Sequence, residues 1–249
     1  MPPDVSTEAA EALAGPRPVR KVLAAPSREG LLICAASLMP GFLFSLMAVS
    51  NGFGLMAMIQ AGPDSDPRGA AAGWLHLGHQ ALTMLFSLLI CWLFLVRRPS
   101  KSGRGAGGWI SDVIAVAGTV VVLVLGMAPK TVDDLLVLSA SEALMTVGLV
   151  VMVIGLASLG RSFGIMPRAR GLVQGGLYRW VRHPIYLGEF LVFGGITILT
   201  FSPLTVATYL IFVGLQLYRL VVEEQTLTDA YPEYHEYRAR TSRLLPGVY

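Results

Sequence analysis

Two groups of ionisable side chains in the last third of the sequence have the types and spacing that a chemical site requires. Arg182 and His183 stand directly before Pro184, and the pair Glu223-Glu224 begins forty residues after His183. Arginine can bind a carboxylate through two parallel hydrogen bonds, and histidine can transfer protons near neutral pH. Where helices end at a membrane surface, such a cluster is a candidate functional site.

The segment between the two groups predicts how they come together. Residues 187–222 form one apolar stretch, which Ser202-Pro203 interrupts. A single helix of this length would exceed a bilayer core of about 30 Å, and proline ends or kinks a helix. We therefore predict a helical hairpin with arms at 187–201 and 204–222. Because the arms are antiparallel, the entrance and the exit of the hairpin lie on the same face of the membrane.

The composition indicates a membrane protein. Hydrophobic residues make up 54% of the 249 residues and charged residues 14%, whereas a soluble chain carries about 25% charged residues. The apolar residues also gather in long runs, as a bilayer requires. A formal net charge of +3 is too small to indicate a nucleic-acid-binding protein. We therefore predict an all-α, polytopic integral membrane protein.

Four further apolar runs precede the hairpin, and each is a predicted transmembrane helix. The first begins at Leu31 and reaches at least Ser50, and the others cover 74–96, 109–128 and 135–160. Basic residues follow the second and the fourth run, and such residues favour the cytoplasmic side. The N-terminus and the ionisable groups are therefore predicted to be cytoplasmic.

The sequence divides into three predicted regions. Residues 1–29 are rich in Ala, Pro and Glu, and we expect a disordered cytoplasmic arm. Residues 30–160 are the four-helix transmembrane region. Residues 161–249 form a module that contains the ionisable groups, the membrane hairpin 187–222 and a polar, tyrosine-rich tail.

The string Gly-x-Tyr-x-x-x-Arg-His-Pro-x-Tyr over 176–186, paired with the later Glu-Glu, is a specific pattern. It resembles the isoprenylcysteine carboxyl methyltransferase family and its bacterial membrane relatives, and the resemblance covers about 161–249. The resemblance implies methyl transfer from S-adenosylmethionine to a lipophilic small molecule or lipid, whose acceptor group is a carboxylate, a thiol or an amine. It also implies a protein of the bacterial inner membrane, with its catalytic tail and site facing the cytoplasm.

The resemblance further implies roles for individual residues. Arg219 corresponds to a substrate-facing, catalytic arginine, and it shares a helix face with Glu223. His183 is the candidate base if the acceptor is a thiol or an amine, whereas an ionised carboxylate needs no base. The carboxylate that binds the cofactor corresponds to Glu223 or to Glu224, because the two glutamates are adjacent and the match can shift by one residue. The expected cofactor contacts are Gly171, Leu172, Val173, Tyr178, Arg182, His183, Pro184, Ile185, Tyr186, Glu223 and Glu224.

Three of these contacts carry a specific chemical expectation. We expect Arg182 to hold the carboxylate of the cofactor bidentately. Tyr178 and Tyr186 are expected to line its adenine or its sulfonium, since a cation near an aromatic face gains about 0.5–2 kcal/mol.

We also expect the acceptor to enter from the lipid, through a gap between the hairpin and the run 135–160, near Gly194 or Gly195.

Two other functions remain open. Glu189 directly after Gly188 also resembles the membrane sterol reductases, which use NADPH, although those proteins usually have Asn after His-Pro, where this chain has Ile185. The second is a non-catalytic membrane protein that retains the cofactor module. His76 and His79 have the spacing of two metal ligands on a helix, but no partner cluster accompanies them. A polar role at the membrane interface is favoured, and no metal site is predicted.

Overall fold

The computed structural model describes residues 28–62, 65–66, 68–96, 128–163 and 169–247, and a few helical residues between 110 and 125. The chain divides into two compact units, Met1–Ala35 and Ala36–Tyr249. Residues 28 and 29 of the predicted arm begin a helix, and the rest of the arm lies outside the described residues. Most of the predicted run 109–128 also lies outside them.

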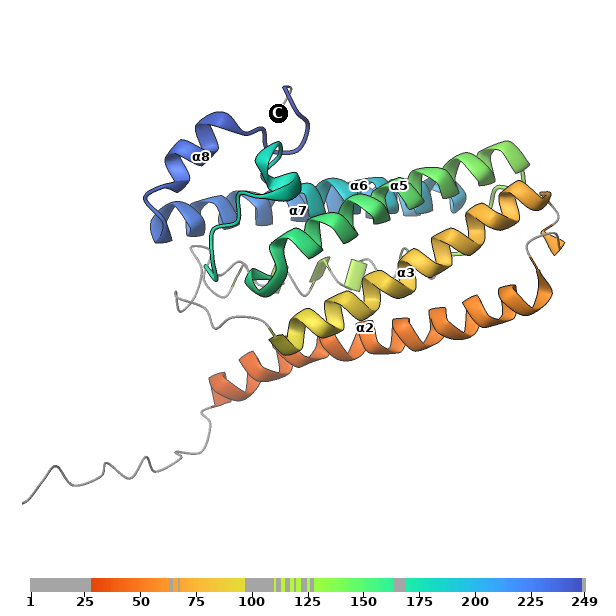
Figure 1. The fold of residues 1–249 in the computed structure, drawn as a ribbon, viewed down its shortest axis with the longest axis horizontal. Helices are drawn as coiled ribbons and strands as arrows, with labels where there is room; N and C mark the ends of the chain where they lie inside the picture. Colours follow the sequence, from red (N-terminus) through yellow and green to blue (C-terminus); the bar gives the residue numbers. More distant parts are fainter. Residues whose placement is uncertain are drawn as a thin grey trace, which may run out of the picture. The chain divides into compact units, whose positions relative to one another are not determined.

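The prediction of an all-α, polytopic membrane protein is confirmed, since the described residues form helices and no strand (Figure 1). Among them, four helical segments are long and apolar enough to cross a membrane, namely Phe42–Ala61, Ala70–Val96, Leu135–Ser162 and Pro203–Ala230. The α-helices whose bounds the structure describes are α2 (Arg28–Ala61), α3 (Ala70–Val96), α5 (Leu135–Leu159), α6 (Pro184–Leu199), α7 (Pro203–Ala230) and α8 (Tyr234–Arg240), and the 3₁₀ helices described with them are η2 (Gly160–Ser162) and η3 (Gly176–Arg179).

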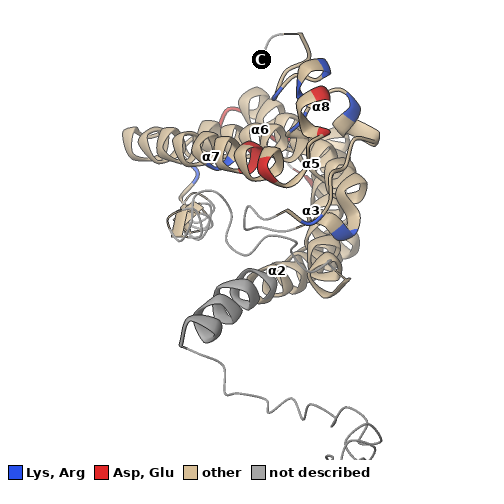
Figure 2. Cartoon of the chain, turned by 90° about the vertical axis from the view of Figure 1, so that its left-hand side faces the viewer, with Lys and Arg blue, Asp and Glu red and all other residues tan. Residues whose placement is uncertain are grey.

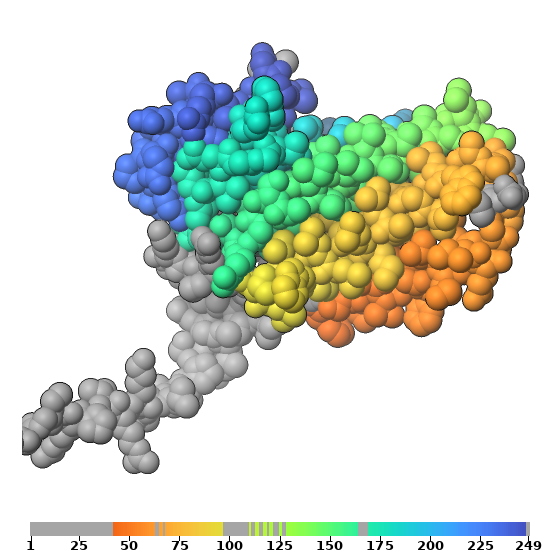
Figure 3. Space-filling model, in the orientation of Figure 1, coloured from red at the N-terminus to blue at the C-terminus, as the bar shows by residue number. Residues whose placement is uncertain are grey.

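Within the second unit, α2, α3 and α5 lie side by side (Figures 1 and 3). Phe44 of α2 meets Phe86 of α3 edge to face, with ring centroids 6.0 Å apart. A buried cluster then joins α3 to α5, and Ile90 and Met152 belong to it. At the far end of the pair, Nε of Arg161 donates to the carbonyl oxygen of Val96 over 3.0 Å. The helices α3 and α5 therefore run in the same direction.

Glycines bring α6 directly against α5. A Cβ added to Gly148 of α5 would lie 2.7 Å from the carbonyl oxygen of Gly188 in α6, and one added to Gly195 would collide with Met145 of α5. Small residues allow such close helix packing in membranes. The gap that we expected between the hairpin and the run 135–160 is therefore closed at Gly195. Gly194 faces Tyr209 of α7 instead.

The predicted turn of the hairpin is confirmed at Ser202-Pro203. Ser202 caps α7 by accepting a hydrogen bond from the backbone N–H of Thr205, whose side chain bonds back to the backbone of Ser202. This reciprocal capping box satisfies two backbone donors at the start of α7. Pro203 occupies the first turn, where a missing N–H costs little.

The predicted second arm, 204–222, is too short. The helix α7 continues to Ala230, so Glu223 and Glu224 lie within it rather than beyond its end. The polar residues at the C-terminal end of α7 include no proline or glycine that would end the helix earlier, and the next proline in the chain is Pro232. The residue before a proline disfavours helical backbone, and Tyr231 is extended accordingly.

The residues after α8 return to the entrance of α6. The backbone N–H of Arg182 donates to the carbonyl oxygen of Ser242 over 2.8 Å, and that of His183 donates to the carbonyl oxygen of Arg243 over 3.1 Å. Charged residues gather near α8 and the end of α7, whereas most of the helix surface elsewhere is uncharged (Figure 2). The tail is therefore an integral part of the C-terminal module.

Candidate functional site

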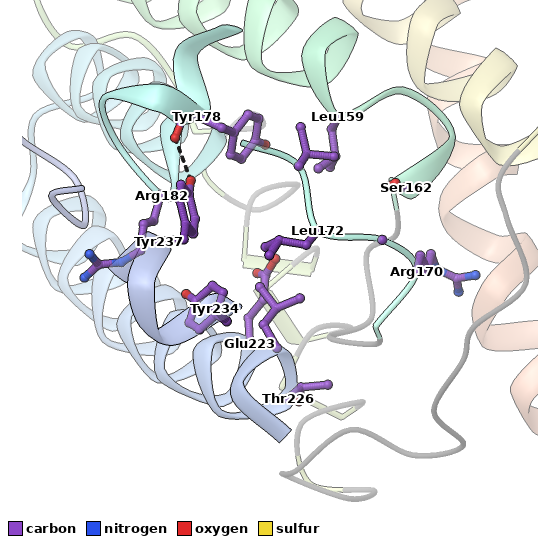
Figure 4. Close-up of a pocket in the computed structure, with 13 residues that line it drawn as sticks. Leu159, Ser162, Arg170, Leu172, Tyr178, Arg182, Glu223, Thr226, Tyr234 and Tyr237 are labelled. Atoms are coloured by element: carbon purple, nitrogen blue, oxygen red, sulfur yellow. Dashed lines mark hydrogen bonds between the residues drawn. The ribbon is translucent and has the colours of Figure 1, made fainter. Parts of the chain in front are cut away.

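A pocket lies between η3, the C-terminal half of α7 and α8, and the extended segment after residue 168 closes one side (Figure 4). Six residues that the sequence analysis named are part of its wall: Gly171, Leu172, Val173, Tyr178, Arg182 and Glu223. The side chains of Leu172, Tyr178, Glu223 and Tyr234 surround the same space in Figure 4. The remaining lining residues are Leu159, Ser162, Arg170, Thr226, Leu227, Tyr234 and Tyr237.

The other predicted cofactor contacts are not among the residues that line this pocket. Pro184 and Ile185 pack against Gly155 of α5, where an added Cβ would meet them at 3.4 and 3.2 Å. Tyr186 is linked to the pocket through Glu223, because its hydroxyl donates a hydrogen bond to Oε2 of that residue over 2.9 Å. The remaining two, His183 and Glu224, belong to a separate polar cluster.

That cluster is centred on Glu224, whose side chain is 4% exposed. Its Oε1 accepts a hydrogen bond from Nε of Arg182 over 2.7 Å, and Nε2 of His183 lies 3.4 Å from the same oxygen. Arg243 approaches Oε2, with its Nη2 at 3.1 Å. Two arginines and a hydrogen-bonding histidine compensate the charge of this buried carboxylate, as burial demands.

Arg182 connects three parts of the module. Besides its bond to Glu224, its Nη1 donates to the carbonyl oxygen of Arg238 over 3.0 Å and to that of Thr241. Its guanidinium points away from the middle of the pocket in Figure 4. A bidentate contact from Arg182 to a ligand would compete with these bonds, so the geometry favours a positioning role for this residue.

Two tyrosines that the sequence analysis did not assign line the pocket from α8. The hydroxyl of Tyr237 donates to the carbonyl oxygen of Tyr178 over 2.6 Å (Figure 4). Burial raises the pKa of Tyr237 to about 12, so this hydroxyl stays protonated at neutral pH. The Tyr234 side chain is almost fully buried, and its hydroxyl has no hydrogen-bond partner among the described residues. An unpaired buried hydroxyl is costly, and a ligand atom can satisfy it.

A strip of polar side chains continues from the pocket along the facing sides of α6 and α7. The Arg219 guanidinium lies 5.5 Å from the ring centroid of Tyr186. Nη1 of Arg219 donates to Oε1 of Gln216 over 2.7 Å, and Nε2 of Gln216 donates to Oε2 of Glu189. The strip therefore runs in the order Glu223, Tyr186, Arg219, Gln216 and Glu189.

Gln216 and Glu189 are not among the site residues predicted from the sequence. The available signal was their spacing, since Tyr186 and Glu189 are three residues apart on one arm of the hairpin and Gln216 and Arg219 are three apart on the other. Residues at that spacing share a helix face. Ionisable residues inside an apolar hairpin are themselves functional candidates.

The histidine pair of α3 lies at the other end of the helix, away from Val96. Nδ1 of His76 meets Oε1 of Glu142 in α5, and Nδ1 of His79 lies 3.2 Å from Oγ1 of Thr146. Nη1 of Arg68 approaches Oε2 of Glu142 at 2.6 Å. The two rings thus contact different side chains of α5.

Comparisons with known proteins agree with the resemblance drawn from the motif. Residues 121–234 match the family model for phospholipid methyltransferase. The chain is also similar to methanethiol S-methyltransferase 1 of Bradyrhizobium diazoefficiens, with 42% identity over 74 residues. That alignment covers 28% of this chain and 24% of the relative, so the chain matches about a quarter of that protein's length. The resemblance to a membrane methyltransferase family is confirmed, and methyl transfer in general is supported.

Proposed function

We propose that this protein transfers a methyl group from S-adenosylmethionine to a lipophilic acceptor at the cytoplasmic face of the membrane. One observation carries the proposal: the pocket of η3, α7 and α8 adjoins a polar strip inside the membrane hairpin, and Glu223 belongs to both. The pocket suits a polar cofactor, and the strip suits the head of an acceptor with an apolar tail. The names of the matched family and of the bacterial relative both describe methyl transfer.

The residues around the pocket fit such a cofactor. S-adenosylmethionine, when bound, supplies a methyl group on a positively charged sulfur, together with an amine, a carboxylate, ribose hydroxyls and an adenine. The Glu223 carboxylate can accept hydrogen bonds from the amine or the ribose. The Tyr234 hydroxyl, which is buried and has no partner among the described residues, is available to the same ligand. The aromatic faces of Tyr178 and Tyr237 can stabilise its positive charge.

The polar cluster around Glu224 has a positioning role in this proposal. Arg182 and His183 hold Glu224, and Arg182 also holds the carbonyl oxygens of Arg238 and Thr241. These bonds fix α7 and α8 relative to the entrance of α6. Accurate placement of the reacting groups can supply a large part of the rate of a direct displacement, because it removes the entropy cost of aligning them.

Arg219 is the residue that we propose to meet the acceptor. It lies one turn before Glu223 on α7, and it is partly exposed although the hairpin around it is apolar. An acceptor with an apolar tail can place its polar end beside Arg219 while the tail stays among the apolar side chains of the hairpin and the lipid. The predicted inner-membrane location and the cytoplasmic site are part of this proposal.

Titration of the purified protein with S-adenosylhomocysteine and with NADPH tests the proposal. We expect calorimetry to detect S-adenosylhomocysteine, because this product retains the groups that the pocket recognises. Binding of NADPH alone would favour a reductase. Binding of neither compound would favour a non-catalytic protein.

A further inference from the structure

The pocket between η3, α7 and α8 is smaller than the cofactor that we propose for it. Its cavity has a volume of about 60 Å³, whereas pockets that bind small molecules and cofactors typically measure about 300–1,000 Å³. S-adenosylmethionine can therefore enter only when part of the wall moves. The contacts that hold each part of the wall indicate which part this is.

Three parts of the wall are held by several contacts. The wall residues of α7 belong to one continuous helix. The hydroxyl of Tyr237 joins α8 to the carbonyl oxygen of Tyr178 in η3. Arg182 also donates to the carbonyl oxygens of Arg238 and Thr241, in α8 and just after it. A movement of η3 away from α8 would therefore break these hydrogen bonds.

The fourth part of the wall is the extended segment 170–174, which we call the strap. Gly171, Leu172 and Val173 of the strap line the pocket. These three residues form no hydrogen bond with the other residues that the structure describes. A segment with few hydrogen bonds opens at a low cost in free energy. The strap is therefore the part of the wall that can move.

Both ends of the strap are fixed. The residue before it, Ala169, is fully buried against the tyrosines of α8. Gly176, shortly after it, has a φ of +60° and packs closely on α5, where an added Cβ would collide with Ser158. Glycine adopts such a conformation without strain. The strap can therefore open by bowing outward between Ala169 and Gly176.

Two contacts keep the strap closed. The side chain of Leu172 packs against the tyrosine cluster of Tyr231, Tyr234 and Tyr237, and in Figure 4 it lies in the space between Tyr178 and Glu223. The amide oxygen of Gln174 accepts a hydrogen bond from Nη2 of Arg240 at the end of α8. Leu172 thus fills part of the cavity, and the bond to Arg240 holds the strap over it.

We propose that the strap is the gate through which the cofactor enters and leaves, and that the bond between Gln174 and Arg240 is its catch. Opening breaks this bond and withdraws Leu172 from the cavity. After the cofactor has entered, the bond forms again and Leu172 packs against the ligand. The inference rests on the proposed methyltransferase function and gives Arg240 a positioning role, since its side chain acts on the cofactor only through the strap.

A cross-link between the strap and α8 tests the gate directly. Gln174→Cys and Arg240→Cys are combined in a background without Cys34 and Cys91, and a short bis-maleimide joins the two thiols. The protein is reconstituted in lipid nanodiscs, and surface plasmon resonance gives the association and dissociation rates of S-adenosylhomocysteine. Each single-cysteine variant, treated with the same reagent, is the matched control.

We expect the cross-link to lower the association rate about tenfold or more, because only molecules with an open strap can take up the ligand. When the cross-link is formed after the ligand has bound, its dissociation should slow by a similar factor. The single-cysteine controls should exchange the ligand much faster than the cross-linked protein. Equal exchange rates in the cross-linked protein and its controls would overturn the gate.

Substitutions of Arg240 test the catch without a cross-link. Arg240→Ala should raise the association and the dissociation rate together, by about three- to tenfold, the usual effect of one lost hydrogen bond. The affinity should change little, because the bond is present with and without the ligand. Arg240→Lys keeps a donor for Gln174 and should restore the wild-type rates. Glu236→Ala, at an exposed position of α8, is the matched control.

The pattern of the two rates separates a catch from other roles of Arg240. A faster dissociation with an unchanged or slower association would mean that Arg240 contacts the ligand or maintains its pocket, and it would overturn the catch. Unchanged rates in Arg240→Ala would do the same. All these results leave the methyltransferase proposal intact. Failure of the wild-type protein to bind S-adenosylhomocysteine would instead overturn that proposal, and the inference with it.

Discussion

Glu223 and Glu224 are adjacent on α7, but their carboxylates have different surroundings. Glu223 lines the pocket and accepts a hydrogen bond from Tyr186 over 2.9 Å, whereas Glu224 is buried and pairs with Arg182 over 2.7 Å. Successive residues of an α-helix point about 100° apart, since the helix has 3.6 residues per turn. Two identical neighbouring side chains can therefore be tested for a binding role and a structural role separately.

Glu223→Gln should weaken the binding of S-adenosylhomocysteine about tenfold, the typical cost of losing one charge-assisted hydrogen bond. The substitution keeps the size of the side chain and an oxygen that can accept from Tyr186, so the fold should persist. Calorimetry gives the affinity, and Glu236→Gln is the control. An unchanged affinity would exclude Glu223 from the cofactor site.

Glu224→Gln should mainly lower stability. Removing one partner of a buried ion pair typically costs about 3–5 kcal/mol, because the remaining charge has no counter-charge. Here the amide can still accept from Arg182, so we expect a loss towards the lower end of that range. The thermal unfolding temperature in detergent is the measurement. If Glu224→Gln melts like the wild type and loses cofactor binding instead, the roles of the two glutamates are reversed.

Gly148→Ala and Gly214→Ala form a matched pair that tests the close packing of α5 on α6. At Gly148 the new methyl group would lie 2.7 Å from the carbonyl oxygen of Gly188, whereas at Gly214 no atom of a described neighbour lies within 4 Å. Overpacking of this kind typically costs about 1–3 kcal/mol. Replacing an exposed glycine inside a helix by alanine stabilises the helix by up to about 1 kcal/mol. Thermal unfolding should therefore shift down for the first variant and stay level or rise for the second.

Labelling of single cysteines tests the predicted orientation in the membrane. Ser65 lies in the loop between α2 and α3, and Gln174 lies in the segment before η3, beyond the opposite ends of the helices. In a background without Cys34 and Cys91, a membrane-impermeant maleimide should label Gln174→Cys in inside-out vesicles and Ser65→Cys in intact cells. The reverse pattern would place the site on the outer face.

The sequence predicts the parts of this structure that depend on local patterns. The length and apolarity of the runs predict the membrane helices, and Ser202-Pro203 predicts the turn of the hairpin, because a capping residue and a proline act within one helical turn. The motif also places Gly171–Val173, Tyr178 and Glu223 in one module, and the structure brings them into one pocket wall.

The remaining features depend on contacts between distant residues. The buried environment of Glu224 depends on Arg182 and Arg243, which are far from it in the sequence, so no local pattern separates it from Glu223. The tyrosines of α8 reach the pocket only because α7 ends before Pro232 and the chain then turns back. The strip from Arg219 to Glu189 forms only when the polar faces of the two hairpin arms are turned towards each other. Residue spacing within one arm does not determine how that arm is rotated about its axis relative to the other.

The bonds between the backbone of 182–183 and that of 242–243 have a consequence for biosynthesis. During translation the N-terminal parts of a chain fold first, so α3, α5 and α6 can enter the bilayer while the tail is still inside the ribosome. Arg182 meets its acceptors on Arg238 and Thr241 only after those residues have emerged. A nascent chain stalled before residue 238 should therefore already be inserted in the membrane while its pocket is still unassembled.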